Sequence, residues 1–207
     1  METQNIIHKL QKYKQVADML SAKKWVHFKW YFFIKESYLK KNFDETLKKR
    51  FCWFYAFRGM SASEKDMFFR YLFSEKDANL RTILQTISQQ RNKVFFSFVT
   101  KLLHTRDNAL PIYDNLVAQI LELPRPTGTT VGEKIQNRER IYETLRVHFQ
   151  ELLSNQRIQL CLENIIEELL KRARQENFQW RDELVTNEKL LDSALWILHK
   201  IKHSGTA

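Results

Sequence analysis

Residues 91–114, RNKVFFSFVTKLLHTRDNALPIYD, contain the clearest fold signal in this chain. Apolar residues recur there at steps of three and four, namely Val94, Phe95, Phe98, Val99, Leu102 and Leu103. This spacing predicts a nearly buried amphipathic helix over residues 92–104. Pro111 restrains the residue before it to extended geometry, so an extended segment should follow. Asp114 then stands at an N-cap position, which predicts a short helix over residues 114–123.

The same spacing extends along most of the sequence. Further helices are expected over residues 6–20, 23–43, 44–58, 61–72, 80–87, 141–152, 158–169 and 186–201, with breaks near Ser21, Gly59, Pro111, 124–133 and 178–185. Asp44, Ser61 with Glu64, and Thr186 are the candidate N-caps. Only four Gly and three Pro occur, which is too little turn chemistry for a sheet of several strands. The fold class is therefore expected to be all-α.

Residues 124–133, PRPTGTTVGE, form the one clear linker, because they hold two of the three prolines and two of the four glycines. The helices after this linker have wide apolar stripes, which must be buried against other apolar surface. We expect them to close the core of a single domain over residues 1–207. A division into 1–123 and 134–207 is the alternative.

The composition excludes several classes of protein. Hydrophobic residues make up 43% and charged residues 28%, as in globular chains. The two cysteines, Cys52 and Cys161, lie far apart and without CxxC or histidine spacing, so we interpret them as reduced core thiols and expect no metal. Phosphate-binding, zinc-protease and hydrolase motifs are absent, and no cofactor is expected. The N-terminus lacks a signal-peptide pattern and no apolar run could span a bilayer, so no membrane contact and a cytoplasmic location are expected.

The positive charge lies mainly in the first third of the sequence. Residues 1–58 carry 13 basic and five acidic side chains, an excess of eight out of a net charge of +10. Such one-sided charge favours a polyanionic partner, of which nucleic acid is the commonest, although solvated helix faces also explain it. The basic residues that we expect to contact phosphates are Lys40, Lys41, Lys48 and Lys49. Between residues 23 and 43, lysines also alternate with aromatic residues, which indicates either a platform for stacking bases or a buried helix with snorkelling lysines.

The stretch from 91 to 114 resembles the helix-hairpin-helix DNA glycosylases. In that family a helix that begins at the hairpin leads through an extended turn to a catalytic aspartate at the start of the next helix. The resemblance implies this scaffold for the present chain, with Lys93 in the place of the hairpin lysine and Asp114 in the place of the aspartate. The amino-acid sequence of this stretch also resembles that of a group of bacterial proteins, which end in a helix similar to residues 191–196, LDSALW.

The family's hairpin contains a Gly-x-Gly turn that approaches a DNA phosphate, whereas residues 87–93, ISQQRNK, contain no glycine. Arg91, Asn92 and Lys93 could replace it as a side-chain clamp at the start of the helix, where the helix dipole favours an anion. Asp114 has two competing roles. It could stabilise the positive charge that develops when an N-glycosidic bond breaks, or it could simply cap the next helix.

The sequence therefore favours a nucleic-acid-binding protein on a degenerate glycosylase-like scaffold, with non-specific binding to DNA. Two alternatives stay open. One is an active base-excision glycosylase that depends on Asp114 and Lys93. The other is a helical protein-interaction module whose apolar C-terminal stripes bind a partner helix.

Overall fold

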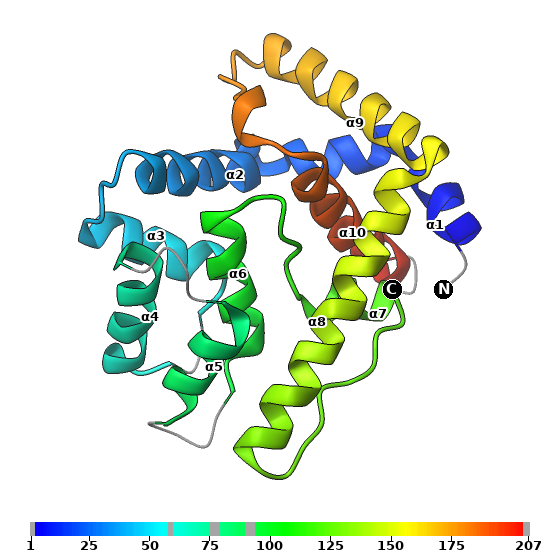
Figure 1. Cartoon of the computed structure of the whole chain (residues 1–207). Coiled ribbons are helices and arrows are strands. Elements are labelled where there is room, and N and C mark those ends of the chain that lie inside the picture. Colours follow the sequence, from blue (N-terminus) through cyan, green and yellow to red (C-terminus); the bar gives the residue numbers. More distant parts are fainter. Residues whose placement is uncertain (1–2, 58–59, 75–78, 90–93, 205–207) are drawn as a thin grey trace.

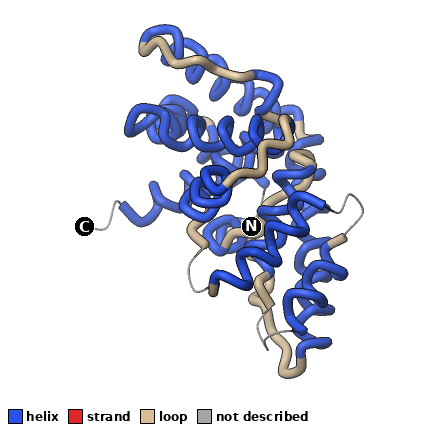
Figure 2. The backbone as a smooth tube through the Cα atoms, turned by 90° about the vertical axis from the view of Figure 1, so that its left-hand side faces the viewer, coloured by secondary structure: helices blue, strands red, loops and turns tan. Residues whose placement is uncertain are grey.

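The computed structural model describes residues 3–57, 60–74, 79–89 and 94–204, and this part of the chain is helical without a strand (Figures 1 and 2). The α-helices are α1 (Thr3–Leu10), α2 (Tyr13–Leu39), α3 (Glu45–Phe54), α4 (Ala62–Ser74), α5 (Leu80–Gln89), α6 (Phe96–Arg106), α7 (Asn115–Ile120), α8 (Val131–Ser154), α9 (Gln156–Gln175) and α10 (Asn187–Ser204). A short 3₁₀ turn, Asp182–Leu184, precedes α10. The all-α class expected from the sequence is confirmed.

Several helices begin at the caps that the sequence predicts. Asp44 accepts a hydrogen bond from the backbone N–H of Leu47 at 2.8 Å and starts α3. Ser61 and Glu64 form the expected capping box at the start of α4, in which Glu64 accepts from the Ser61 backbone at 2.5 Å. The Thr186 hydroxyl oxygen accepts a hydrogen bond from the backbone N–H of Lys189 at 3.2 Å, and Thr186 starts α10. These side chains satisfy backbone donors that the first turn of a helix leaves free.

The break expected near Ser21 is wrong. The chain breaks instead at residues 11–12, and α2 continues through Ser21, whose hydroxyl donates to Ala17 O at 2.9 Å within the helix. The irregularity of α2 lies slightly later, where Lys24 and Trp25 have φ values of 57° and 61° in the left-handed region. This backbone places the Trp25 ring on Phe178, 4.6 Å away. Burial of that ring offsets the cost of left-handed residues.

The helices after the linker pack on those before it (Figure 1). α9 lies along α2 and α1, α8 packs on α5, and α10 contacts α7, α2 and α1. α3 packs on α2, and α4, α5 and α6 pack against one another beside it. The apolar stripes of α8, α9 and α10 are thus buried in the chain's own core, and the chain forms a single domain.

The loop between α7 and α8 ends earlier than the expected linker. Thr130 and Glu133 form a capping box, so residues 131–133 are helical rather than part of a linker. Gly128 has a φ of 122°, and a Cβ there would lie 2.7 Å from the backbone N of Lys134. The tight entry into α8 therefore requires glycine at this position.

None of the described helices is both long and apolar enough to cross a membrane.

Candidate nucleic-acid interface

The four lysines expected to contact phosphates differ in their surroundings. Lys40 and Lys41 lie at the C-terminal end of α2, where the helix dipole favours a cation, and Lys40 forms an ion pair with Glu36 at 3.5 Å. Lys48 donates to Glu45 at 2.7 Å, and this hydrogen bond raises its pKa. Lys48 is also 3.8 Å from Asp66. Lys49 and Lys41 are exposed and form no ion pair with any described residue. Lys41 and Lys49 are therefore the more available cations of this set.

A platform of two tryptophans and two cations lies across α2 and α3. Trp30 of α2 and Trp53 of α3 meet edge to face, with ring centroids 5.9 Å apart. The Arg50 guanidinium covers the Trp30 ring at 3.9 Å, and Lys29 Nζ lies 5.7 Å from the same ring. Trp53 is 60% exposed, whereas a side chain of this size usually buries most of its surface. We call Lys29, Trp30, Arg50 and Trp53 the tryptophan platform.

The spacing of the residues on α3 explains why this platform forms. Leu47 and Phe51 lie on the inward stripe of α3 and are fully buried. Arg50 and Trp53 are three residues apart, so they lie next to each other on the helix surface, away from that stripe. α3 packs on α2, which brings both side chains beside Trp30.

Further aromatic rings continue from the platform toward α10. His27, one turn before Trp30 on α2, lies 5.5 Å from Phe54 and 6.1 Å from Trp196 of α10. Lys200 Nζ lies 3.4 Å from the centroid of the Trp196 ring. Burial, together with the charges of Lys189 and Lys200, lowers the pKa of His27, so its ring is neutral at pH 7. The row therefore has cations at both ends, Lys29 and Arg50 at Trp30 and Lys200 at Trp196, with neutral rings between them.

Asp114 is the N-cap of α7, as its sequence context predicts. Its Oδ1 accepts from the backbone N–H of Leu116 at 2.9 Å. Its neighbours Tyr113 and Asn115 line a small cavity of about 260 Å³ together with Phe95 and Phe98, but Asp114 itself does not line it.

A buried cluster of charges lies on the inner side of Asp114. Lys101 of α6 is buried and donates from Nζ to Tyr55 O at 3.2 Å. Burial lowers the pKa of Lys101, and the negative charges of Asp114 and Asp192 oppose that shift. On α10, Lys189 donates to Asp192 at 3.0 Å, and both side chains are buried. Burial raises the pKa of Asp192, and Lys189 opposes that shift.

His104 ties the extended turn after α6 to this cluster. Its Nδ1 lies 2.7 Å from Leu110 O and its Nε2 lies 3.4 Å from the Tyr31 hydroxyl. Burial lowers the pKa of His104 to about 3, so the ring is neutral. A neutral ring with its proton on Nδ1 donates to Leu110 and accepts from Tyr31 at Nε2. These contacts hold the backbone that leads to Asp114.

This cluster combines a carboxylate, a buried amine with a lowered pKa and a fixed helix start. Such groups can stabilise a developing positive charge or supply an amine nucleophile. None of the cavities described in the structure is lined by Lys101, Asp114 or Asp192. The cluster joins charges from α6, from α10 and from the start of α7.

The remaining candidates, Arg91, Asn92 and Lys93, lie outside the described residues. After them the described chain resumes at Val94, and α6 begins at Phe96. No group of three or more His, Cys, Asp or Glu that could hold a metal ion occurs among the described residues.

Reasoning from the sequence missed Arg50, Trp53, Lys101 and Asp192. The sequence contains two signals that could have pointed to these residues. Trp53 lies off the inward stripe of its helix although it is the largest side chain there, and Lys101 and Asp192 are charges inside apolar runs. A charge at a core position indicates a buried polar contact, because burial of an unpaired charge costs several kcal/mol, on the order of 3–5 when its partner is removed.

Comparisons with protein-family models, with curated proteins and with solved structures found no match.

Proposed function

We propose that this protein binds single-stranded nucleic acid without sequence preference, through the tryptophan platform and the neighbouring exposed lysines. The observation that carries this proposal is the 60% exposure of Trp53 beside a Trp30 ring that Arg50 covers at 3.9 Å. An exposed indole offers a base a stacking surface, and an adjacent guanidinium offers a phosphate a charge-assisted hydrogen bond.

The charge around the platform supports a polyanionic partner. Lys29, Lys49 and Arg50 form no ion pair with a described residue, so their charges are available to phosphates. Lys41, just beyond the end of α2, is a further exposed cation without an ion pair among the described residues. Stacking contributes roughly 1–3 kcal/mol per base, and its strength depends little on which base stacks. This chemistry favours unpaired bases over a duplex, whose base faces are already stacked.

The test is a titration of a fluorescent poly-dT oligonucleotide, followed by anisotropy. Replacement Trp53→Ala should weaken binding about 5- to 150-fold, which corresponds to the loss of one stacked base. Leu160→Ala on α9 is the matched control, because Leu160 is 57% exposed and lies on a different helix, and it should leave the affinity unchanged. Equal affinity of the wild-type and Trp53→Ala proteins would remove the platform from the interface.

A salt series separates this proposal from a protein-interaction module. If Lys29, Lys49 and Arg50 each neutralise one phosphate, the logarithm of the affinity should fall with a slope of about −2 against the logarithm of salt. That slope means roughly twentyfold weaker binding on going from 50 to 200 mM salt. An apolar protein interface would lack this dependence.

Cleavage of a glycosidic bond at Asp114 is the second candidate function. The observation that favours it is that Asp114 lies close enough to Lys101 and Asp192 for its charge to act on the pKa of both side chains. The assay offers duplexes with alkylated, oxidised or deaminated bases and scores abasic sites. Asp114→Asn keeps the capping oxygen and removes the charge, so activity that is lost without loss of stability would support catalysis.

A further inference from the structure

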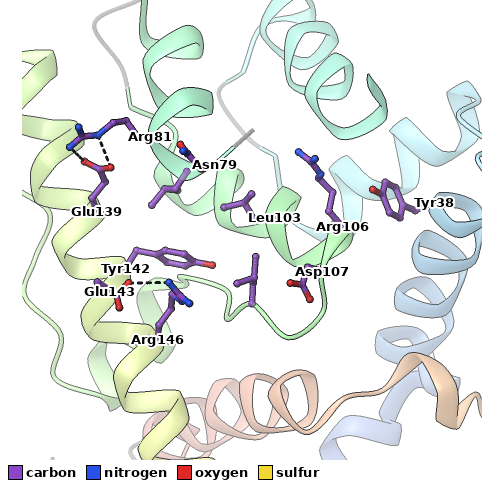
Figure 3. A pocket seen from close by; sticks show the side chains of 12 residues that line it. Tyr38, Asn79, Arg81, Leu103, Arg106, Asp107, Glu139, Tyr142, Glu143 and Arg146 are labelled. Atoms are coloured by element: carbon purple, nitrogen blue, oxygen red, sulfur yellow. Dashed lines mark hydrogen bonds and ion pairs between the residues drawn. The ribbon is translucent and has the colours of Figure 1, made fainter. Parts of the chain in front are cut away.

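A cleft of about 730 Å³ lies between α5, α6 and α8 (Figure 3). Its apolar lining comes from Leu80, Leu103 and Leu110. The Tyr38 ring at the end of α2 and the Tyr142 ring of α8 also line it, and the Tyr142 hydroxyl donates to Pro111 O at 3.1 Å. A volume of this size is typical of small-molecule sites, and an apolar lining with a few polar groups is their usual composition.

Most charges in the cleft are already matched. Arg81 of α5 donates to both carboxylate oxygens of Glu139, at 2.8 and 2.7 Å, and Arg146 donates to Glu143 at 3.1 Å (Figure 3). The first pair bridges α5 and α8 at one side of the cleft, and the second lies along α8. Neither arginine therefore needs a further anion.

Arg106 is the exception. Its side chain lines the cleft, its Nη1 is buried, and it forms no hydrogen bond or ion pair with any described residue. A guanidinium presents several donors in a fixed, charged fork that fits a carboxylate. Because Arg106 is only half-buried and lines the cleft without a carboxylate partner among the described residues, its charge is available to an oxyanion bound in the cleft.

We propose that the cleft binds a small aromatic monocarboxylate, with its carboxylate on Arg106 and its ring against Tyr38, Tyr142 and the three leucines. Asp107, Glu139 and Glu143 also line the cleft. Their negative charges disfavour a phosphate dianion more than a monoanion, since the repulsion grows with the ligand's charge. Glu139 and Glu143 lie on α8, so they can accept a hydrogen bond from a hydroxyl at the other end of the ligand's ring.

The probe is 4-hydroxyphenylacetate, and its neutral control is 4-hydroxyphenylacetamide. Titration of the full chain, followed by calorimetry and by amide chemical shifts, should give saturable binding of the acid with shifts centred on α6 and α8. The amide should bind at least about tenfold more weakly, because it lacks the charge that pairs with Arg106. Absence of saturable binding, or equal binding of acid and amide, would overturn the proposal.

Arg106→Gln should weaken binding of the acid by about tenfold or more, and Arg106→Lys should restore part of it. Arg174→Gln on α9 is the matched control, because Arg174 is exposed and does not line the cleft. A cooperative thermal transition of Arg106→Gln shows that the variant is folded, and a thermal shift on adding the acid that is present in the wild type and absent in the variant shows that the variant does not bind. Tighter binding of inorganic phosphate than of the acid would contradict the assignment of a carboxylate. No residue of the tryptophan platform lines the cleft, so this result is independent of nucleic-acid binding.

Discussion

Replacement of Asp192 by Asn should destabilise the fold strongly, because it leaves the charged Lys189 buried without its counter-ion. The two side chains meet at 3.0 Å on successive turns of α10, and Lys189 is 2% exposed. Lys101 lies close enough for its charge to act on Asp192, so the loss of the carboxylate removes a negative charge that acts on both buried lysines.

The magnitude follows from the burial of the pair. Removal of one partner of a buried ion pair costs about 3–5 kcal/mol, whereas an exposed pair contributes about 0–1 kcal/mol. In a chain of this length, 1 kcal/mol shifts the melting temperature by roughly 2–4 °C, so Asp192→Asn should lower it by roughly 6–20 °C. Glu139→Gln, which breaks the more exposed pair with Arg81, should lower it by only a few degrees.

The assay is urea and thermal unfolding followed by circular dichroism at pH 7. The double variant Lys189→Met/Asp192→Leu should recover most of the lost stability, because it replaces both charges by apolar groups of similar size. A loss below about 1 kcal/mol for Asp192→Asn would refute the role of this pair in holding α10, because it would equal the effect of an exposed pair.

Three further predictions concern the turn after α6 and the entry into α8. Asp114→Ala should cost about 0.5–2 kcal/mol in urea unfolding and Asp114→Asn much less, since Asn keeps the oxygen that accepts from Leu116; equal losses would argue against the cap. The pKa of His104 is lowered from 6.5 to about 3, so the unfolded chain binds a proton that the folded chain does not, and stability should fall as the pH drops from about 6.5 to 3, by up to about 1.4 kcal/mol per pH unit. His104→Gln should flatten this part of the stability profile, and an unchanged slope would contradict a buried neutral ring. Gly128→Ala should destabilise the protein by more than about 1 kcal/mol, since its backbone has positive φ and a Cβ would meet Lys134, and a neutral result by thermal unfolding would exclude that strain.

Local rules predicted much of the fold. The caps at Asp44, Asp114 and Thr186 each depend on a side chain and a backbone donor within three residues, so their positions follow from the sequence. The spacing of apolar residues gave the helices for the same reason. The end of the linker was wrong because the capping box of Thr130 and Glu133 outweighed the glycine and proline content around it.

Contacts between distant residues were not predictable in this way. The left-handed backbone of α2 at Lys24 and Trp25 accompanies a contact of this kind, because Trp25 donates to Glu176 at 2.8 Å, 151 positions away in the sequence. The tryptophan platform likewise needs α2 and α3 to pack in one register. Lys29 and Trp30 fall within the stretch of alternating lysines and aromatics that the sequence shows, whereas Arg50 and Trp53 were not predicted. Lys101 and Asp192 are charges inside apolar runs, and only the packing of α6 and α10 brings them into one buried cluster.

The most direct test of nucleic-acid binding is a titration of the ¹⁵N-labelled chain with poly-dT, followed through the tryptophan indole N–H signals. A base that stacks on the platform should shift the indole signals of Trp53 and Trp30 upfield. The signal of Trp180 should change little, because Trp180 packs against Phe28, with ring centroids 4.7 Å apart. Shifts that concentrate on helices other than α2 and α3, or indole signals of Trp30 and Trp53 that stay fixed at saturation, would contradict the platform as the binding surface.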